Sequence, residues 1–247
     1  MNAKMFWLSI IAVIISFIGG FYLANTLNGN ELMTLRGENE RLKKSETDQP
    51  QNDSELSLTD EELRQKIAEA DKNPTNFAFQ RNLGLALFSY GAMKQDVNLI
   101  TESARILQRA FNNNPKDYDV IVTIGNAFYD IASIKRDNAG YLKSREYYLK
   151  ALEQKADDAG VRADYGSTFL FAEPVDLEKA ISELQKSLQF DPKNERGLKF
   201  MTQALLKQNK KEEAEKYFGR LKEINPKTPD INELNKQISP GNNTNQK

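Results

Sequence analysis

The apolar and polar positions separate an uncharged N-terminal stretch from a longer amphipathic body. Residues 5–27 carry no charged side chain, and a helix rising 1.5 Å per residue over this length would cross a hydrocarbon core of roughly 30 Å. We therefore predict an N-terminal transmembrane signal-anchor over residues 1–27, with Met5–Leu27 contacting the lipid bilayer. The alternative is a cleaved signal peptide, although this stretch is longer than the usual apolar region of one.

Charges on either side of the uncharged stretch predict its orientation. Lys4 and the amino terminus precede it, whereas Glu31 comes before the first downstream positive charge, Arg36. Positive charge favours the cytoplasmic side of a span. We therefore expect a single-pass protein whose N-terminus is cytoplasmic and whose body is extracytoplasmic.

Two polar segments follow the predicted anchor. In residues 28–44, apolar positions and one asparagine recur with 3-4-3 spacing, which predicts a short juxtamembrane helix of coiled-coil type. An asparagine on such a seam favours a parallel dimer, so we predict a homodimer contact there, with a single solvated helix as the alternative. Residues 45–58 are polar and predict a flexible linker. The seam residues are Leu32, Leu35, Asn39 and Leu42.

The body begins with a helix signal at Thr59. Thr59 and Glu62 form a capping-box pattern, and Leu63, Ile67 and Ala70 lie on one helical face. Because no helix of the body precedes this segment, we expect it to cap the N-terminal end of a helical array.

Three glycines recur inside apolar, helix-like runs of the body. Gly84, Gly125 and Gly166 are evenly spaced, since both intervals, 84 to 125 and 125 to 166, are 41 residues. Glycine inside a helix costs about 0.5–1 kcal/mol relative to alanine, so its regular return indicates a packing position in a repeat.

Four segments within residues 74–226 resemble the tetratricopeptide repeat (TPR), a helix–turn–helix unit of about 34 residues. Each has an apolar residue followed by a small one. Near the end of the second helix, the first three units have a large residue and then a small one, whereas the fourth has Leu221 at the small position. The resemblance implies an all-α fold over residues 59–238: a right-handed α-solenoid of about four TPR hairpins with N- and C-terminal capping helices. The apolar–small pairs are Leu83–Gly84, Ile124–Gly125, Tyr165–Gly166 and Met201–Thr202.

The repeats are unequal in length. The first two are longer than the family pattern by about two helical turns, which predicts taller hairpins with tips near residues 93–99 and 134–141. We expect the apolar stripe of the second hairpin to continue to Ile134. After the last repeat, Ile231, Leu234 and Ile238 predict the C-terminal cap, and residues 239–247 a disordered tail.

Composition argues against catalysis and nucleic-acid binding. The net charge is −1, with 34 basic and 35 acidic residues, which gives no field favouring nucleic acid. The chain has no cysteine and no histidine, which removes thiol chemistry, the commonest general base and the commonest metal ligand. We therefore predict no enzyme activity, no catalytic residue, no cofactor and no metal.

The resemblance implies a concave groove that holds extended or helical peptides, lined by the first helix of each repeat. An aromatic centre with basic ends would suit a peptide with an apolar stripe and an acidic terminus. The residues carried over from the family pattern are Arg81, Leu85, Phe88, Asn126, Tyr129, Asp130, Ser167, Phe171, Lys199 and Gln203.

The whole layout resembles bacterial membrane-anchored TPR proteins. It implies a protein–protein interaction scaffold of the inner membrane whose repeats face the periplasm and bind partner proteins or peptides. The alternatives are a cytochrome c biogenesis factor that holds apocytochrome, and an envelope enzyme. The sequence selects neither the partner nor the process.

Overall fold

The structure, a computed structural model, describes residues 59–228 and 231–238, which contain ten helices and no strand. By its backbone contacts the chain divides into two compact units, residues 1–72 and 73–247. The predicted membrane span, coiled-coil seam, linker and C-terminal tail lie outside the described residues. Within the described ranges, no helix combines the length and apolar character needed to cross a bilayer.

The described part of the first unit is α3 (Asp60–Lys72), which begins with the predicted capping box. The Thr59 hydroxyl oxygen accepts a hydrogen bond from the Glu62 backbone N–H at 3.2 Å. In return, a Glu62 carboxylate oxygen accepts from the Thr59 backbone N–H and hydroxyl, both at 2.9 Å. Hydrogen bonds from the Thr59 backbone and hydroxyl lower the pKa of Glu62. The role of α3 as an array cap stays a prediction.

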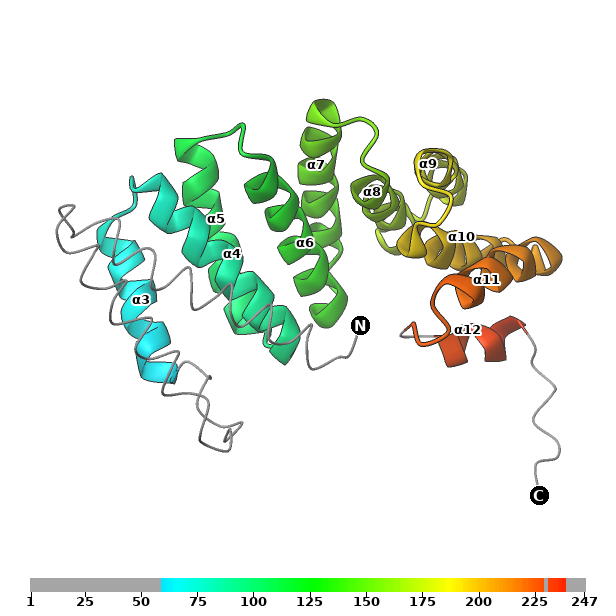
Figure 1. Cartoon of the computed structure of the whole chain (residues 1–247), viewed down its shortest axis with the longest axis horizontal. Helices are drawn as coiled ribbons and strands as arrows, with labels where there is room; N and C mark the ends of the chain where they lie inside the picture. Colours follow the sequence, from blue (N-terminus) through cyan, green and yellow to red (C-terminus); the bar gives the residue numbers. More distant parts are fainter. Residues whose placement is uncertain (1–58, 229–230, 239–247) are drawn as a thin grey trace, which may run out of the picture. The chain divides into compact units, whose positions relative to one another are not determined.

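The described part of the second unit consists of four helical hairpins and one short terminal helix (Figure 1). Within each hairpin, the two helices contact one another more extensively than either contacts any other helix. The hairpins are α4 (Phe77–Lys94) with α5 (Val97–Asn113), α6 (Tyr118–Lys135) with α7 (Asn138–Gln154), α8 (Ala159–Phe171) with α9 (Leu177–Phe190), and α10 (Glu195–Lys207) with α11 (Lys211–Ile224), followed by α12 (Ile231–Ile238).

Short polar side chains start nearly every helix of this unit. Before each helix from α4 to α10, an Asp or Asn oxygen accepts a hydrogen bond from a backbone N–H two or three residues on, which satisfies a donor that has no partner in the helix. Helix α11 has no such side-chain cap: it follows Lys210 and has Glu212 and Glu213 in its first turn. The capping residues are Asn76, Asp96, Asp117, Asp137, Asp158, Asp176 and Asn194.

Three glycines allow the two helices of a hairpin to approach closely. A Cβ atom at Gly84 would lie 2.5 Å from Leu107 Cγ, and one at Gly125 would lie 2.8 Å from the Tyr148 ring. At Gly166 the nearest atom would be Leu184 Cγ at 3.1 Å. Because each partner is fully or almost fully buried, it has little room to move aside.

The first two hairpins are longer than the last two, as the sequence predicts. Helices α4–α7 have 17 or 18 residues, whereas α8–α11 have 13 or 14. The apolar stripe of α6 ends earlier than predicted, however. Ile131 is partly buried, but Ile134 is 49% exposed because it lies in the last turn, beyond the partner helix's buried face.

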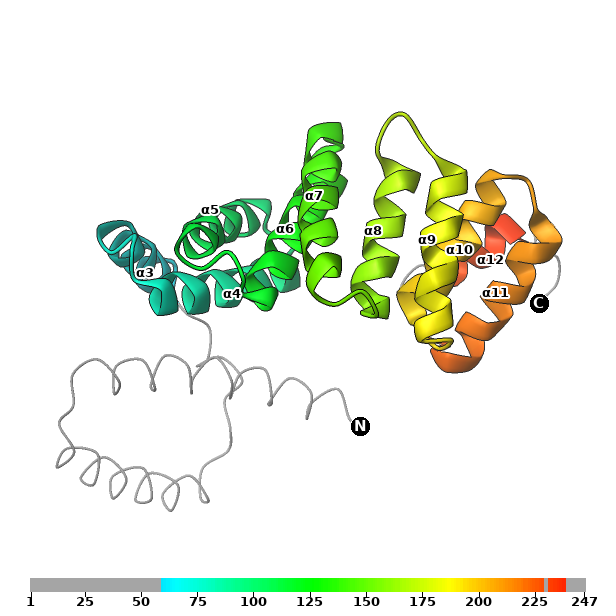
Figure 2. The ribbon, with the colours of Figure 1, turned by 90° about the horizontal axis from the view of Figure 1, so that it is seen from above.

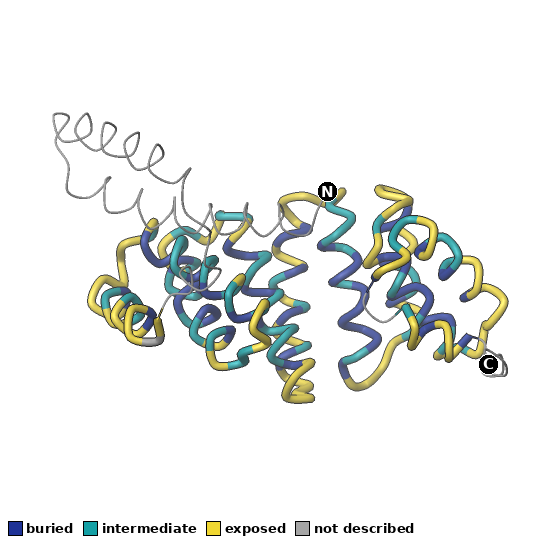
Figure 3. Tube along the Cα trace, turned by 60° about the horizontal axis from the view of Figure 1, so that its bottom comes forward, coloured by how far each residue is buried: buried dark blue, intermediate teal, exposed yellow. Residues whose placement is uncertain are grey.

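Successive hairpins pack against one another in chain order, and the order is easiest to follow in Figure 2. The second helix of each hairpin contacts the first helix of the next, and α12 contacts α10 and α11. First helices also contact each other in the pairs α4–α6 and α8–α10, whereas α6 and α8 make much less backbone contact. Buried residues line the inner sides of the hairpins, and the turns are exposed (Figure 3).

The C-terminal helix α12 completes the core of the last two hairpins. Leu234 and Ile238 are buried in one apolar cluster with Met201 and Phe218, and Ile231 packs against it. This agrees with the predicted C-terminal capping role, because a terminal hairpin would otherwise leave one apolar face exposed.

Candidate functional site

The ten residues predicted to line a groove all lie in first helices: α4, α6, α8 and α10. Nine of them are partly buried, and Ser167 is fully buried. Their contacts within the second unit differ, and these contacts decide which side chains remain available to a partner.

Arg81 is engaged within the chain. Its guanidinium forms ion pairs with Asp117 at 3.0 Å and with Asp119 at 2.6 Å. Asp117 is also the N-cap of α6, so one carboxylate starts that helix and joins it to α4. Arg81 therefore connects two hairpins, and its charge is compensated rather than offered as the basic end of a groove.

Leu85 and Phe88 belong to the packing between the first two hairpins. Leu85 packs on a buried cluster that includes Leu107 and Ile124, and Phe88 packs on one that includes Ile100 and Ala127. Their partial burial is therefore explained by core contacts.

Asn126 and Ser167 are occupied by hydrogen bonds of the fold. The hydroxyl of the buried Tyr148 donates to the Asn126 side-chain oxygen at 2.9 Å. The Ser167 hydroxyl donates to the Asp164 backbone carbonyl at 2.7 Å. Ser167 is 0% exposed and so is closed to a partner.

Four aromatic rings from four helices gather where the second hairpin meets the third. Tyr129 lies 5.3 Å from Tyr141 and 6.3 Å from Phe171, both edge-to-face. Phe171 stacks with Tyr141 at 5.9 Å and meets Phe200 edge-to-face at 6.1 Å. We call Tyr129, Tyr141, Phe171 and Phe200 the aromatic cluster. Such geometries are favourable for aromatic pairs.

Asp130 follows the first ring of this cluster in α6. It is partly buried, and burial raises its pKa to about 6. Among the described residues it has no hydrogen-bond or ion-pair partner. Its charge contributes to the raised pKa of Tyr141, for which burial is the larger cause, so the two side chains are near one another.

Asp164 of α8 is a second buried carboxylate of the same region. Burial raises its pKa to about 7, against the opposing effect of Arg196; the charges of Asp130 and Asp158 add to the increase. Arg196 of α10 forms a short ion pair with it, which joins the third and fourth hairpins. Asp164 is therefore partnered, and Asp130 is not.

Three polar residues of α10 also belong to this region: Lys199, Gln203 and Lys207. A buried oxygen of the Gln203 amide has no hydrogen-bond partner among the described residues. The Lys207 ammonium donates to the Leu170 carbonyl at 3.0 Å and lies 5.6 Å from the Phe171 ring centre. The Lys199 ammonium lies 5.0 Å from the Phe200 ring centre.

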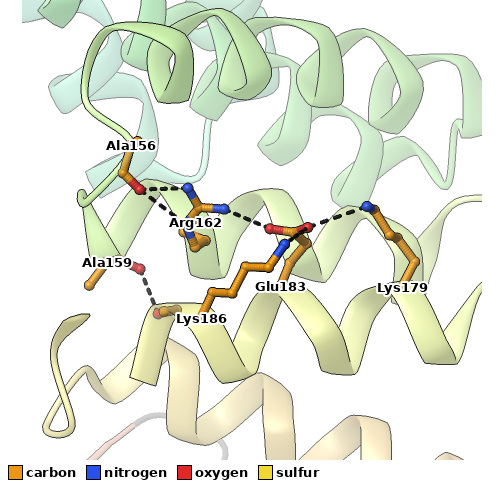
Figure 4. A network of polar contacts seen from close by, with 7 residues as sticks. Ala156, Ala159, Arg162, Lys179, Glu183 and Lys186 are labelled. Carbon is orange, nitrogen blue, oxygen red and sulfur yellow. Dashed lines mark hydrogen bonds and ion pairs between the residues drawn. The ribbon is translucent and has the colours of Figure 1, made fainter. Parts of the chain in front are cut away.

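A separate charged network joins α8 to α9 (Figure 4). Arg162, Lys186 and Lys179 converge on Glu183 at 2.7, 3.0 and 3.3 Å. Burial alone would raise the pKa of Glu183, but hydrogen bonds from Lys186 and Arg162 outweigh it, and the pKa is lowered. Glu183 is 5% exposed in its side chain, so this network fastens a hairpin rather than presenting a carboxylate.

Aromatic rings and polar side chains make up this region, where the second hairpin meets the third. Within residues 59–228 and 231–238, no group of three or more acidic side chains is placed to hold a metal ion. Three members were missed by the sequence analysis: Tyr141, Asp164 and Phe200. Tyr141 lies in a second helix, and Asp164 and Phe200 lie beside the expected positions, so only their spatial convergence identifies them.

Comparison with known proteins supports the repeat assignment. Residues 175–238, which include α9 to α12, match the tetratricopeptide repeat family. No curated protein matches the chain by sequence. The match covers the C-terminal repeats, and the fold of the preceding hairpins is recognised through solved structures.

Three solved structures have a similar fold. The crystal structure of MamA is 17% identical, with a TM-score of 0.52, over 67% of this chain and 88% of that one. YrrB, a TPR protein with an unusual peptide-binding site, is 16% identical, with a TM-score of 0.54, over 71% and 84%. A thermophilic TPR protein of Thermus thermophilus is 13% identical, with a TM-score of 0.54, over 72% and 90%. At these identities the similarity establishes the TPR fold.

Proposed function

We propose that this chain, which has the tetratricopeptide repeat fold, is a scaffold that binds segments of other proteins. The observation that carries the proposal is the side-chain group at the meeting of the second and third hairpins. There the partly exposed rings of the aromatic cluster, Tyr129, Tyr141 and Phe171, accompany Asp130, a carboxylate with no partner among the described residues. Catalytic chemistry has no comparable support, because the chain has no histidine or cysteine.

The structure narrows the surface that we propose. Five of the predicted groove residues already make contacts within the fold. Ion pairs engage Arg81, core packing engages Leu85 and Phe88, and hydrogen bonds engage Asn126 and Ser167. The binding surface therefore centres on Tyr129, Asp130 and Phe171, with Lys199 and Gln203 of α10 as further members. A peptide with an acidic terminus is no longer the best match to this surface, because the positive charge of Arg81 is already paired with Asp117 and Asp119.

We further propose that the uncharged residues 5–27 anchor this scaffold in the inner membrane of a bacterial envelope, with the repeats in the periplasm. A tether would raise the local concentration of the binding surface near membrane partners. The support is the sequence pattern alone. The narrower alternative, a factor that holds apocytochrome c, specifies a ligand that no described residue selects.

The test is site-specific photo-cross-linking of the full-length protein in native membranes. A photoreactive residue at Ser133, exposed in α6 one turn beyond Asp130, should cross-link defined proteins, which mass spectrometry would identify. The same residue at Glu146, exposed on α7, is the matched control and should capture fewer. Equal, diffuse labelling from both positions would contradict the proposed surface. Loss of the protein from washed membranes would contradict the tether.

A further inference from the structure

We propose that the bound segment is apolar and carries a lysine or arginine, whose cationic group docks beside Asp130 and the rings of Tyr129 and Tyr141. The inference rests on the proposed function, because it specifies the chemistry of the segment that the scaffold binds. It concerns a contact between this chain and a partner protein.

The first reason is that Asp130 differs from other carboxylates that the second unit buries fully or in part. Asp117 has Arg81, Asp164 has Arg196, and Glu183 has three cations. Asp158 caps α8 and accepts a hydrogen bond from the Tyr118 hydroxyl at 2.7 Å. Across the described part of the chain, nothing comparable reaches Asp130.

The second reason is its position in the helix. Asp130 lies in the C-terminal half of α6, so it does not cap a helix start and receives no favourable contribution from the helix dipole. Its pKa of about 6 has burial as its cause, with no cation lowering it. At neutral pH it is therefore mostly ionised, partly desolvated and uncompensated, a state that an arriving cation would relieve.

The third reason is the chemistry of the neighbouring side chains. Asp130 follows Tyr129 in α6, and the Tyr129 ring lies 5.3 Å from that of Tyr141. The charge of Asp130 also contributes to the raised pKa of Tyr141, for which burial is the larger cause. A lysine or arginine placed there would form a charge-assisted hydrogen bond and also contact aromatic rings. One available carboxylate among rings suits a side-chain cation, whereas a divalent metal needs several oxygen ligands.

The apolar character of the segment follows from the aromatic cluster. Phe171 is partly exposed and continues the surface from α6 to α8. Apolar side chains on either side of the cation would cover it, and they would exclude water from the ion pair. An ion pair shielded in this way is stronger than one in open solvent.

Defined peptides would test the inference. Full-length protein in nanodiscs of zwitterionic lipid is titrated with fluorescent ten-residue peptides of alanine and leucine that differ only in one central residue: lysine, norleucine or glutamate. We expect the lysine peptide to bind about tenfold more tightly than the norleucine peptide, a difference of about 1.4 kcal/mol, and the glutamate peptide to bind most weakly.

Two variants identify the carboxylate responsible. Asp130→Asn should reduce the preference for lysine over norleucine to about twofold or less. Asp157→Asn removes an exposed carboxylate of the loop before α8 and should leave the preference unchanged. Thermal unfolding of each variant verifies that it is folded.

The outcomes separate this inference from the proposed function. Equal binding of lysine and norleucine peptides by the wild type, or a preference that survives Asp130→Asn, would overturn the inference and leave the scaffold intact. Failure of every peptide to bind would also overturn it. Cross-linking from Ser133 decides independently whether the surface binds proteins.

Discussion

The contact inside the first hairpin and the contact between the second and third hairpins are built in opposite ways. Inside the first hairpin, Gly84 has no side chain, and the α4 backbone therefore lies directly on Leu107 of α5. Between the second and third hairpins, α6 and α8 make little backbone contact, and large rings fill the space. Small residues give close packing of helices, whereas side chains at a wider junction can also contact solvent and partners.

The first junction between hairpins resembles the hairpin interior. Leu107 and Ala110 of α5 pack with Val120 and Ile124 of α6 in one buried cluster. At the second junction, the corresponding cluster receives a single fully packed residue, Val161, from α8, and is surrounded by tyrosines that are only partly buried. The difference shows that hairpins of similar sequence need not stack alike, and the looser junction is where we propose the binding surface.

The largest expected effect is at the wide junction. Phe171→Ala removes a ring that contacts Tyr129, Tyr141 and Phe200, and should lower the free energy of unfolding by about 2–3 kcal/mol. Chemical denaturation measures the change. The control is Phe190→Ala, because that ring is 51% exposed and should cost less than about 1 kcal/mol. Equal losses would show that the aromatic cluster does not hold the junction.

The close packing inside the hairpin can be tested with alanine. At Gly84, a methyl group would meet Leu107 within 2.6 Å, so Gly84→Ala should destabilise the protein by about 1–2 kcal/mol even though alanine favours helices. At Gly219 of α11, nothing lies within 4 Å of the added methyl group, and Gly219→Ala should stabilise by about 0.5–1 kcal/mol. Effects of the same sign at both positions would contradict the packing role.

The smallest effect, and the one specific to the unpaired carboxylate, depends on pH. Asp130 and Asp164 have pKa values of about 6 and 7, above the ordinary value of 3.8. Between these pKa values, the folded protein holds protons that the unfolded chain releases. The stability contributed by the two protonated carboxyls is therefore complete below about pH 4 and is lost as pH rises through 6 to 7. Asp130→Asn should raise the free energy of unfolding by about 1 kcal/mol at pH 7.5 and change it little at pH 4.

Denaturation at a series of pH values checks this expectation. Asp164 remains in the variant, so part of the pH dependence should persist, and Asp157→Asn should follow the wild type throughout. A loss of stability in Asp130→Asn at pH 7.5 would mean that the carboxylate has a compensating partner, which would argue against an available docking point.

Much of the fold could be predicted from the sequence. The spacing of Gly84, Gly125 and Gly166 indicated the hairpins, and the capping box at Thr59 and the apolar spacing in 231–238 located the terminal helices. These predictions succeeded because helix starts and helix packing depend on residues close together or at fixed repeat positions. Ile134 was misplaced because apolar periodicity does not reveal where the neighbouring helix ends.

The candidate surface followed less completely from the pattern. The repeat positions placed Arg81 and Ser167 on the expected helices, yet Arg81 is neutralised by two aspartates some 36 and 38 residues away in the chain, and Ser167 is buried. Repeat registers assign a side chain to a helix face, but they do not show which side chains from other hairpins reach it.

The sequence by itself therefore determined the helices, their unequal lengths and the small residues at which paired helices meet, because each depends on local periodicity and on the size of a single side chain. Only the tertiary structure decided that α6 and α8 make little backbone contact and meet through the rings of Tyr129 and Phe171. It also decided that no described cation pairs with Asp130, whereas Arg196 pairs with Asp164. Those features depend on side chains from four different helices coming together. Which charges pair across hairpins is decided by that arrangement, because the partners are far apart in the sequence.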